Sequence, residues 1–383
     1  MFDKILVREE GSIKQIAGMK DGDLREFVVI DSNKANEGNI YLGKIVKKIQ
    51  TANGYSGYFV NIGGDKEAFI NAEERKLESL NACEGQSIIV QVLQEQRAEK
   101  GARVTRFLQI VGTFLVYSPY GEDILVSAKI DDEEKREELG NLIADNVDQG
   151  GWMVRTQALD AQKEDILKEL KILQSVFNNI LIRVKNLKAP ALLFTNDNYL
   201  DEMIKRSQSC SLKIEVNSHI LEKELSDKAV VLFNAKAFEE AGIEEKINNA
   251  LSKNVKLNCG GRVIIEETKA FVAIDVDSGE GFTQGGINRL NQEAAHEIVR
   301  QILLRNLSGK IIIDFAGNNE FKFLKSVIDI LVKGLAQDVS KAKVLGVSRA
   351  GNVEIVRSRK RPSLRDLFSE ECVTCQGTGR VEK

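Results

Sequence analysis

The chain has 383 residues, of which 43% are hydrophobic and 29% are charged, and its formal net charge is -3. This length indicates two to four domains, and the composition is typical of a soluble globular protein. With only 3 prolines and no low-complexity tract, long disordered linkers are excluded. We expect no membrane span, because no uncharged apolar run of about 18 residues occurs. The first residues lack the apolar core of a signal peptide, so we expect a cytoplasmic protein.

The N-terminal part of the chain predicts short β-strands. Residues 1–32 hold two strand patterns, KILVRE and FVVID, separated by Gly22-Asp23. Residues 38–70 hold three more, punctuated by Asn53-Gly54 and Gly63-Gly64, and IIVQVLQEQ at 88–96 supplies a fourth. Short strands at this spacing favour a small barrel, for which the OB fold is one candidate.

Aromatic and basic residues interleave within this predicted barrel. They are Tyr41, Tyr55, Tyr58, Phe59, Phe69, Lys44, Lys47 and Lys48. Rings stack on bases and cations attract the backbone, so the pattern indicates a surface for single-stranded nucleic acid. Strand alternation must also bury some rings, and we expect roughly half of the aromatic residues to form barrel core.

The rest of the chain predicts a mixed α/β protein. Residues 111–156 combine three strand patterns with an acidic helix at 131–145. Residues 161–187 predict a long amphipathic helix, because apolar residues recur at spacings of three and four. These apolar residues include Ile166, Leu170, Leu173 and Phe177.

The C-terminal half predicts strands that alternate with helices. PALLF at 190–194 predicts a buried strand, followed by a helix and the strands LKIEV and AVVLF. Further on, RVIIEE and AFVAIDV flank a predicted hairpin turn at Glu267-Thr268. We then predict a helix at 288–306, the strand KIIIDF and a helix at 319–337.

Two of these predicted strands end on carboxylates. Asp275 and Asp277 share one face of the strand, because side chains i and i+2 point the same way. KIIIDF ends on Asp314 with the same pattern. If the two strands are neighbours, Asp275 and Asp314 lie side by side at the carboxyl edge of the sheet, where α/β proteins bind ligands. The alternative is that these aspartates only end strands and form turns.

Paired carboxylates of this kind suit Mg²⁺, which prefers oxygen ligands. A magnesium ion lowers the pKa of a water molecule and aligns it with a phosphodiester. Other chemistries are excluded by pattern, since the chain has no phosphate-loop or nucleophile-elbow motif, and GEGFTQGG misses the third glycine of a dinucleotide loop. Only His219 and His296 occur, which disfavours a two-histidine nuclease.

A basic run extends from Lys341 to Arg365. It holds eight basic residues and one acid, Glu354. Either the run is a solvated face, or it contacts phosphate.

The cysteines divide into two groups. Cys83, Cys210 and Cys259 are scattered, as is typical of reduced thiols. Cys372 and Cys375 form Cys-x-x-Cys followed by Gly-x-Gly. These two thiols are either a redox pair or half of a zinc site shared by two chains, because zinc needs four ligands. We favour the shared zinc, since no βαβ setting for a redox helix precedes them.

Taken together, these motifs resemble the ribonuclease E/G endoribonucleases over nearly the whole chain. The matching stretches, in the family's order, are GNIYLGKI, YFVNIGGDKEAFI, GGRVIIEETKAFVAIDVDSG, IIIDF, RKRPSL and CVTCQGTG. The resemblance implies an α/β (α+β) multidomain fold. Its expected parts are an RNase-H-like subdomain (1–37 and 190–255), an OB-fold RNA-binding domain (38–110), a 5′-sensor region (111–189), a DNase-I-like catalytic subdomain (256–366) and a zinc link (367–383).

The resemblance also implies residue roles. Asp275 and Asp314 match the magnesium-binding catalytic aspartates. Phe59, Phe69 and Lys100 match the RNA contacts of the OB domain. The pocket for a 5′-monophosphate maps onto Gly112, Val116, Arg155, Thr156 and Lys341. Arg155 would supply a bidentate phosphate fork and Thr156 a hydroxyl donor. Cys372 and Cys375 match the zinc ligands. We expect a homodimer through that zinc and not a tetramer, because this sequence stops soon after the cysteines, whereas many family members continue into a small domain used for higher assembly.

Asp277 is the main departure, because the family usually has Asn at that position. We count Asp277 among the catalytic residues. An amide donates to the scissile phosphate, whereas a carboxylate repels phosphate or recruits further metal. The following GEGF also lacks a basic residue that family members often carry.

The resulting hypothesis is a cytoplasmic, Mg²⁺-dependent endoribonuclease for single-stranded RNA. The resemblance implies RNA processing, including that of ribosomal RNA, and RNA decay, with a preference for 5′-monophosphorylated substrates. Metal-activated water would leave products with a 5′-phosphate and a 3′-hydroxyl. The alternative is a catalytically weak or inactive RNA-binding or scaffold protein of the same fold, which Asp277 and GEGF favour. Nuclease action on DNA is a third possibility.

Overall fold

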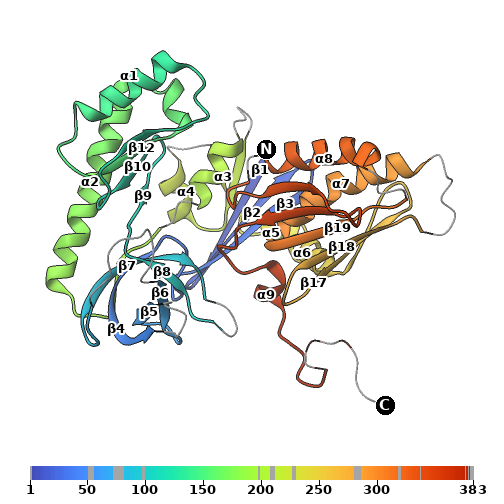
Figure 1. Cartoon of the computed structure of the whole chain (residues 1–383), viewed down its shortest axis with the longest axis horizontal. Coiled ribbons are helices and arrows are strands. Elements are labelled where there is room, and N and C mark those ends of the chain that lie inside the picture. The colour runs from blue at the N-terminus through green and yellow to red at the C-terminus, as the bar shows by residue number, and fades with distance from the viewer. Residues whose placement is uncertain are drawn as a thin grey trace. The chain divides into compact units, whose positions relative to one another are not determined.

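The chain divides into two compact units, which are coloured by residue number in Figure 1. One unit joins residues 1–33 to 197–383, and the other comprises 34–196. The computed structural model describes residues 2–50, 56–71, 82–96, 100–196, 199–207, 212–226, 230–279, 286–317, 321–336, 338–375, 377 and 379. The predicted turn at Asn53-Gly54, residue Tyr55 and most of GEGF lie outside these residues.

The first unit opens with a five-stranded sheet in the order β15-β14-β1-β2-β3. Its strands are β1 (Lys4–Glu10), β2 (Ile13–Lys20), β3 (Asp23–Asp31), β14 (Lys213–Val216) and β15 (Val230–Phe233). The first three are antiparallel, whereas β14 and β15 run parallel to β1. The sequence predicted two strands before residue 32; β2 was missed, because its lysines and glycine weaken the strand pattern.

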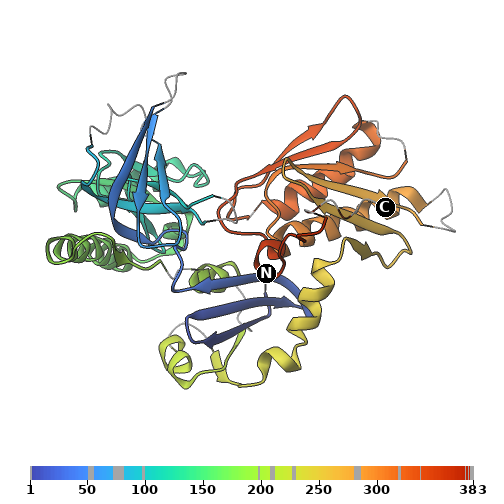
Figure 2. The same cartoon turned by 90° about the horizontal axis from the view of Figure 1, so that it is seen from below.

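Helices cover both faces of this sheet. One face packs on α3 (Tyr199–Ser207) and α4 (His219–Leu225). The other face packs on α5 (Ala237–Glu240) and α6 (Ile243–Leu251), drawn in yellow beside the blue strands in Figure 2.

The second sheet of the same unit has the order β16-β17-β18-β19-β21-β20. Its strands are β16 (Asn254–Lys256), β17 (Arg262–Glu267), β18 (Val272–Asp277), β19 (Gly309–Asp314), β20 (Lys343–Val347) and β21 (Val353–Arg357). The helices that follow or connect them are α7 (Ile287–Leu304), α8 (Phe321–Leu335) and α9 (Leu364–Phe368). Because α7 connects β18 to β19, these two strands are parallel, while the other neighbours are antiparallel.

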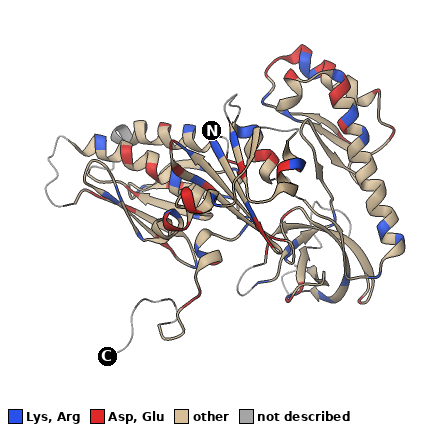
Figure 3. Cartoon of the chain, turned by 180° about the vertical axis from the view of Figure 1, so that it is seen from behind, with Lys and Arg blue, Asp and Glu red and all other residues tan. Residues whose placement is uncertain are grey.

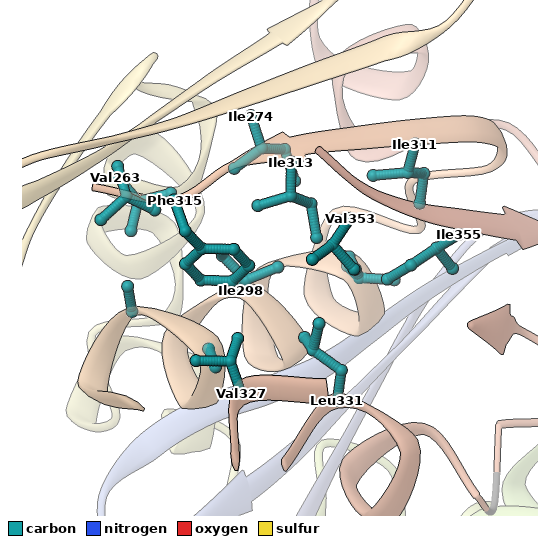
Figure 4. Close-up of a cluster of buried hydrophobic side chains, with 14 of the residues drawn as sticks. Val263, Ile274, Ile298, Ile311, Ile313, Phe315, Val327, Leu331, Val353 and Ile355 are labelled. Atoms are coloured by element: carbon teal, nitrogen blue, oxygen red, sulfur yellow. The ribbon is translucent and has the colours of Figure 1, made fainter. Parts of the chain in front are cut away.

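Strand alternation gives this sheet one apolar face. Ile274 on β18 and Ile311 and Ile313 on β19 are buried. They pack against residues of α7 and α8 such as Ile298 and Leu331, as Figure 4 shows. Figure 1 shows both helices on the same face of the sheet. Each buried isoleucine stabilises the fold by roughly 1.5–3 kcal/mol, so this face fixes which side chains must point the other way.

The hairpin before this crossover differs from the prediction. The turn comprises residues 268–271, because Glu267 pairs with Val272 across the ladder. Thr268 closes it by donating from its backbone N–H and its hydroxyl to the carbonyl oxygen of Phe271 (3.0 and 2.6 Å). The predicted turn at Glu267-Thr268 was therefore wrong by about two residues. The basic run also contains an unpredicted hairpin, β20–β21.

The second unit contains a small closed barrel. Its strands are β4 (Ile40–Gln50), β5 (Ser56–Asn61), β6 (Ala68–Asn71), β7 (Ser87–Gln94) and β8 (Arg103–Thr105). The barrel closes because β4 pairs with both β5 and β7, and β13 (Ala191–Phe194) adds to β4. The fifth strand, β8, was not predicted, because its sequence RVT is too short to show alternation.

A four-stranded sheet completes this unit, in the order β11-β12-β10-β9. It comprises β9 (Ile110–Val111), β10 (Leu115–Ser118), β11 (Ile124–Val126) and β12 (Gly151–Val154), with α1 (Glu133–Ala144), a 3-10 helix η2 (Thr156–Asp160) and α2 (Lys163–Asn186). The stripe of Ile166, Leu170 and Leu173 on α2 is buried in the core of this region. The first half of helix α1 carries both charge signs (Figure 3).

The observed architecture agrees with the predicted class at a coarse level, as a mixed α/β protein with several sheets and a small barrel. The assignment of individual parts as RNase-H-like, OB-fold, 5′-sensor, DNase-I-like and zinc-link domains stays a prediction. Within the described residues, no helix is long and apolar enough to cross a membrane.

A buried ion pair ties the end of α8 to the last strand of the second sheet. Arg357 Nε and Nη2 each donate to Asp338 across 2.9 Å, and both side chains are almost fully buried. Burial acts to raise the pKa of Asp338, but Arg357 and the backbone N–H groups of Ala342 and Ser340 outweigh it and leave that pKa lowered. Removing one partner of such a pair leaves an uncompensated buried charge.

We therefore expect Asp338→Ala to lower the free energy of unfolding by about 3 kcal/mol or more. The contribution of ionised Asp338 to the free energy of unfolding is present above the ordinary carboxyl pKa of 3.8 and is lost as the pH falls through the lowered pKa. Chemical denaturation at pH 7 measures it. Glu266→Gln is the control, because the Lys253–Glu266 pair is exposed and should change the midpoint little. Equal midpoints for Asp338→Ala and the wild type would contradict the expectation.

Candidate active site and nucleic-acid interface

The two aspartates predicted to be neighbours are brought together by the structure. β18 and β19 pair in parallel, and Asp275 lies directly opposite Asp314 in the register. Both residues are exposed, on the face of the sheet opposite the apolar core. Side chains at directly opposed positions of adjacent strands are close neighbours, so two carboxylates converge at one edge of the sheet.

The pKa of Asp275 is raised by its surroundings, which include the neighbouring carboxylates. Partial burial raises its pKa first, and the negative charges of Asp314 and Asp277 raise it further, against an opposing effect of Arg262. A cation between the two carboxylates would relieve the repulsion. Two carboxylate side chains at a solvent-facing edge form a donor set that fits Mg²⁺, which binds one or two carboxylates and keeps several waters.

Asp277 lies on the same face but is engaged by a partner. Arg262 on β17 is directly opposite Asp277 in the antiparallel register. Its Nε donates to Asp277 Oδ2 across 2.8 Å, and its Nη2 also donates to that oxygen. Asp277 Oδ1 accepts from the backbone N–H of Gly279 across 2.9 Å. Gly279 and Arg262 together lower the pKa of Asp277, so Asp277 is a neutralised carboxylate.

The barrel presents an aromatic and basic row on its outer surface. Phe59 on β5 pairs with Phe69 on β6, and their half-buried rings meet edge to face with centroids 5.8 Å apart. The register continues on both sides, with Lys47 opposite Phe59 and Arg103 opposite Phe69. Lys100, also predicted to bind RNA, is exposed shortly before β8. Rings flanked by cations suit single-stranded nucleic acid.

A glycine makes room for this row. A Cβ on Gly57 would lie 2.4 Å from Cζ of Phe69, so the ring of Phe69 lies across the backbone of the neighbouring strand. The other predicted aromatics divide as strand alternation requires. Tyr41 and Tyr58 are buried in the barrel core, and Tyr55 lies outside the described residues.

Four residues of the predicted 5′-phosphate pocket lie close together around the sheet of β9–β12. Arg155 follows β12, and its Nη1 donates to the carbonyl oxygen of Gly112. Thr156 Oγ1 is 3.1 Å from Oγ of Ser127. Val116 on β10 lies between Val111 and Met153 in the ladder. All four predicted residues are half-buried.

The loop of this pocket is organised by an internal carboxylate, Glu169 of α2. Its side-chain oxygens accept hydrogen bonds from the backbone N–H groups of Thr113, Phe114 (2.6 Å) and Leu115 (2.9 Å). A Cβ on Gly112 would lie 2.6 Å from the carboxyl carbon of Glu169. Three successive amides around one anion form a backbone nest, which holds the loop where Arg155 binds it.

Lys341, the fifth residue predicted for this pocket, belongs to the other compact unit. It is exposed, in the segment between α8 and β20, and its backbone has a positive φ of 54°. Its proposed role stays a prediction.

Cys372 and Cys375 lie in a turn after α9. Hydrogen bonds to the Cys372 sulfur from the backbone N–H groups of Cys375 and Thr374 lower the pKa of this thiol. Gly377 and Gly379 follow with φ values of 78° and 70°, which only glycine adopts readily. No group of three or more metal-ligating side chains occurs among the described residues. A metal bound by these two sulfurs would therefore require further ligands.

The basic run serves in part as internal structure. Arg357 holds Asp338, and Arg359 donates to the hydroxyl and carbonyl oxygens of Ser308 at 2.8 and 3.2 Å. The Arg361 guanidinium lies 4.8 Å from the ring centre of Tyr199. At these three positions the basic residues make contacts within their own unit. Neither predicted alternative, a solvated face or a phosphate-binding surface, therefore describes the whole basic run.

Comparison with known proteins decides the family. A model of the ribonuclease E/G family matches residues 109–360, which is more than half of the 383 residues. The chain belongs to the ribonuclease E/G family. It is similar to ribonuclease G of Haemophilus influenzae, at 30% identity over 96% of this chain and 82% of that protein. Ribonuclease G of Escherichia coli strain K12 is 28% identical over 100% of this chain and 85% of its own length.

The similarity extends to ribonuclease E. The protein of that name from Nostoc is 28% identical over 100% of this chain, which spans 59% of that longer protein. The family resemblance predicted from the motifs is therefore confirmed.

Three residues at the sites of this ribonuclease E/G member were missed in the sequence. Glu169 could have been predicted to hold a partner, because it lies between Ile166 and Leu173 on the buried stripe of α2, where a carboxylate needs hydrogen-bond donors. The contacts of Arg262 and Arg103 could not have been predicted, because they depend on strand register and not on local sequence pattern.

We expect Glu169→Ala to leave the amides of residues 113–115 without their acceptor. Hydrogen exchange at these amides should accelerate about 10- to 100-fold, as for a lost hydrogen bond to a charged group. Glu164→Ala, an exposed carboxylate on the first turn of the same helix, is the control and should leave exchange unchanged. Unaltered exchange in Glu169→Ala would show that the carboxylate does not hold the loop.

Proposed function

We propose that this chain is an endoribonuclease that cleaves single-stranded RNA at a divalent metal ion held by Asp275 and Asp314. Membership of the ribonuclease E/G family supports the reaction class. The observation that carries the proposal is the direct pairing of Asp275 with Asp314. The buried opposite face of the sheet holds these two strands in that register.

The chemistry follows from this arrangement. A bound Mg²⁺ supplies a lowered water pKa and stabilises negative charge on the phosphodiester. Asp275 and Asp314 would hold that cation through their carboxylate oxygens. Water oxygen bonds to phosphorus while the P–O3′ bond breaks, and a proton from that water goes to the 3′-oxygen, which leaves a 5′-phosphate and a 3′-hydroxyl. These products define a hydrolase that uses water in place of the RNA 2′-hydroxyl.

The barrel supplies binding surface for the RNA chain. Phe59 and Phe69 present ring faces and edges on which bases stack, at roughly 1–3 kcal/mol per base. Lys100, with Lys47 and Arg103 at the ends of the row, attracts the phosphate backbone. Stacking on an aromatic ring does not depend on which base stacks, so this surface suits single strands of many sequences.

The pocket around Arg155 supports a preference for a 5′-monophosphate. Arg155 offers a guanidinium fork and Thr156 a hydroxyl, while Gly112 and Val116 provide a close backbone wall. Lys341 is proposed as a fifth contact. A terminal monophosphate carries more negative charge than an internal phosphodiester, so the guanidinium of Arg155 should bind chain ends more tightly.

A non-catalytic RNA-binding protein is the alternative function, and Asp277 was its main support. The Arg262–Asp277 pair weakens that support, because a neutralised carboxylate adds little repulsion toward phosphate. The enzyme remains the better proposal.

Cleavage of one oligonucleotide tests the enzyme. We expect the wild type with Mg²⁺ to cut a 5′-monophosphorylated single-stranded RNA faster than its 5′-hydroxyl form, and to leave DNA of the same sequence intact. Asp314→Asn should lower the rate at least 100-fold, roughly the scale for losing a key electrostatic group. Asp329→Asn, an exposed aspartate on α8, is the control. Equal, metal-independent rates for wild type and Asp314→Asn would end the proposal, whereas tight RNA binding without cleavage would favour the alternative.

We further propose a structural zinc shared by two chains through Cys372 and Cys375. Elemental analysis of the purified protein should find about one zinc per two chains, because tetrahedral sites need four ligands. Cys372→Ser should lose both the zinc and the dimer. Cys83→Ser, an exposed cysteine elsewhere, should lose neither. A stable dimer without metal would contradict the shared site.

A further inference from the structure

Arg262 is the one cation that the register places beside the aspartate pair on the three adjacent strands β17, β18 and β19. It lies opposite Asp277, and Asp277 is two residues from Asp275 on the same face. Arg262 is therefore a diagonal cross-strand neighbour of Asp275, within reach of a long side chain. Asp275 in turn lies opposite Asp314. Half of the Arg262 side chain is exposed, at 50%, so solvent and substrate have access to it.

The hydrogen bonds of Arg262 leave part of its guanidinium available. Among the described residues its partner is Asp277, which takes Nε–H and one N–H of Nη2. A guanidinium has five N–H donors, so the Nη1 edge remains for an incoming acceptor. Asp277 is itself fixed by the Gly279 backbone. The arginine is thus held on one side and open on the other, which is the usual requirement for a preorganised anion contact.

We infer that Arg262, held in place by Asp277, binds the RNA phosphate that lies against the Asp275–Asp314 pair. This inference rests on the proposed function, since it names a further substrate contact at the same site. A phosphodiester that approaches two carboxylates meets repulsion, and a guanidinium beside them provides charge-assisted hydrogen bonds to its oxygens. Asp277 then acts as a positioning residue, which works through Arg262 and does not touch the substrate.

A purely structural pair is the competing explanation, in which Arg262 serves only to neutralise Asp277. The two explanations differ in what happens when both charges are removed together. If neutralisation is the whole role, Arg262→Ala/Asp277→Asn leaves no unpaired charge and cleaves like the wild type. If Arg262 binds phosphate, the double variant stays as slow as Arg262→Ala. Double-mutant comparison isolates this coupling.

The experiment measures kcat/KM of the full-length protein on single-stranded RNA with Mg²⁺. We expect Arg262→Ala to lose about 10- to 100-fold, the scale of a charge-assisted hydrogen bond. Arg262→Lys should recover part of the loss, and millimolar guanidinium should stimulate Arg262→Ala but not the wild type. Lys253→Ala is the control, because Lys253 forms an exposed ion pair with Glu266 at the other end of β17. Its rate should stay within about twofold of the wild type.

Wild-type rates in the double variant, or no guanidinium rescue, would overturn the inference. Thermal unfolding of each variant shows whether it is folded; a misfolded Arg262→Ala would be replaced by Arg262→Gln, which keeps a polar side chain of similar reach. If the wild type binds RNA but cuts none, the proposed function fails on its own. The inference is then decided by affinity, since an unchanged Kd for Arg262→Ala would overturn it as well.

Discussion

The candidate catalytic site depends on the parallel pairing of β18 with β19. That register sets two carboxylates opposite each other. Their mutual repulsion costs about 1 kcal/mol at the dielectric constant of water and about 4 kcal/mol at that of a protein surface. Burial of Ile274, Ile311 and Ile313 on the reverse face contributes more, at roughly 1.5–3 kcal/mol each. The apolar core therefore stabilises a pair of charges that would not approach on their own. A cation between the two carboxylates would relieve their remaining repulsion.

Carboxylates elsewhere in the protein show how acidic groups are otherwise accommodated. Asp338 is enclosed by Arg357, Glu169 by three backbone amides and Asp277 by Arg262. Each has donors matched to its oxygens, so each contributes to shape. Asp275 differs in that its pKa is raised, by partial burial and then by the carboxylate of Asp314 that faces it. The contrast separates acids that organise the protein from the pair that is suited to take up a cation.

Much of the site could be predicted from short patterns. Apolar runs that end in aspartate indicated β18 and β19. Alternation predicted that roughly half of the barrel aromatics form core, as Tyr41 and Tyr58 do, but not which ones. The contacts of Arg262 could not be predicted, because they depend on hairpin register. A turn at Glu267-Thr268 would have placed Asp277 opposite Asn258, whereas the observed turn at 268–271 places it opposite Arg262. A displacement of two residues changes every partner across the ladder. Strands β2, β8 and β20–β21 were missed because lysine, glycine or short length masks their periodicity.

The Arg262–Asp277 pair has a consequence for which substitutions this edge of the sheet accepts. Either replacement alone leaves one formal charge unmatched beside the aspartates, whereas the exchanged pair restores neutrality. The two positions are therefore coupled in charge as well as in space, and exchanging them one at a time passes through a form with altered charge. A substitution at one position is constrained by the residue across the ladder, so the charge at Asp277 is a property of two strands and not of one.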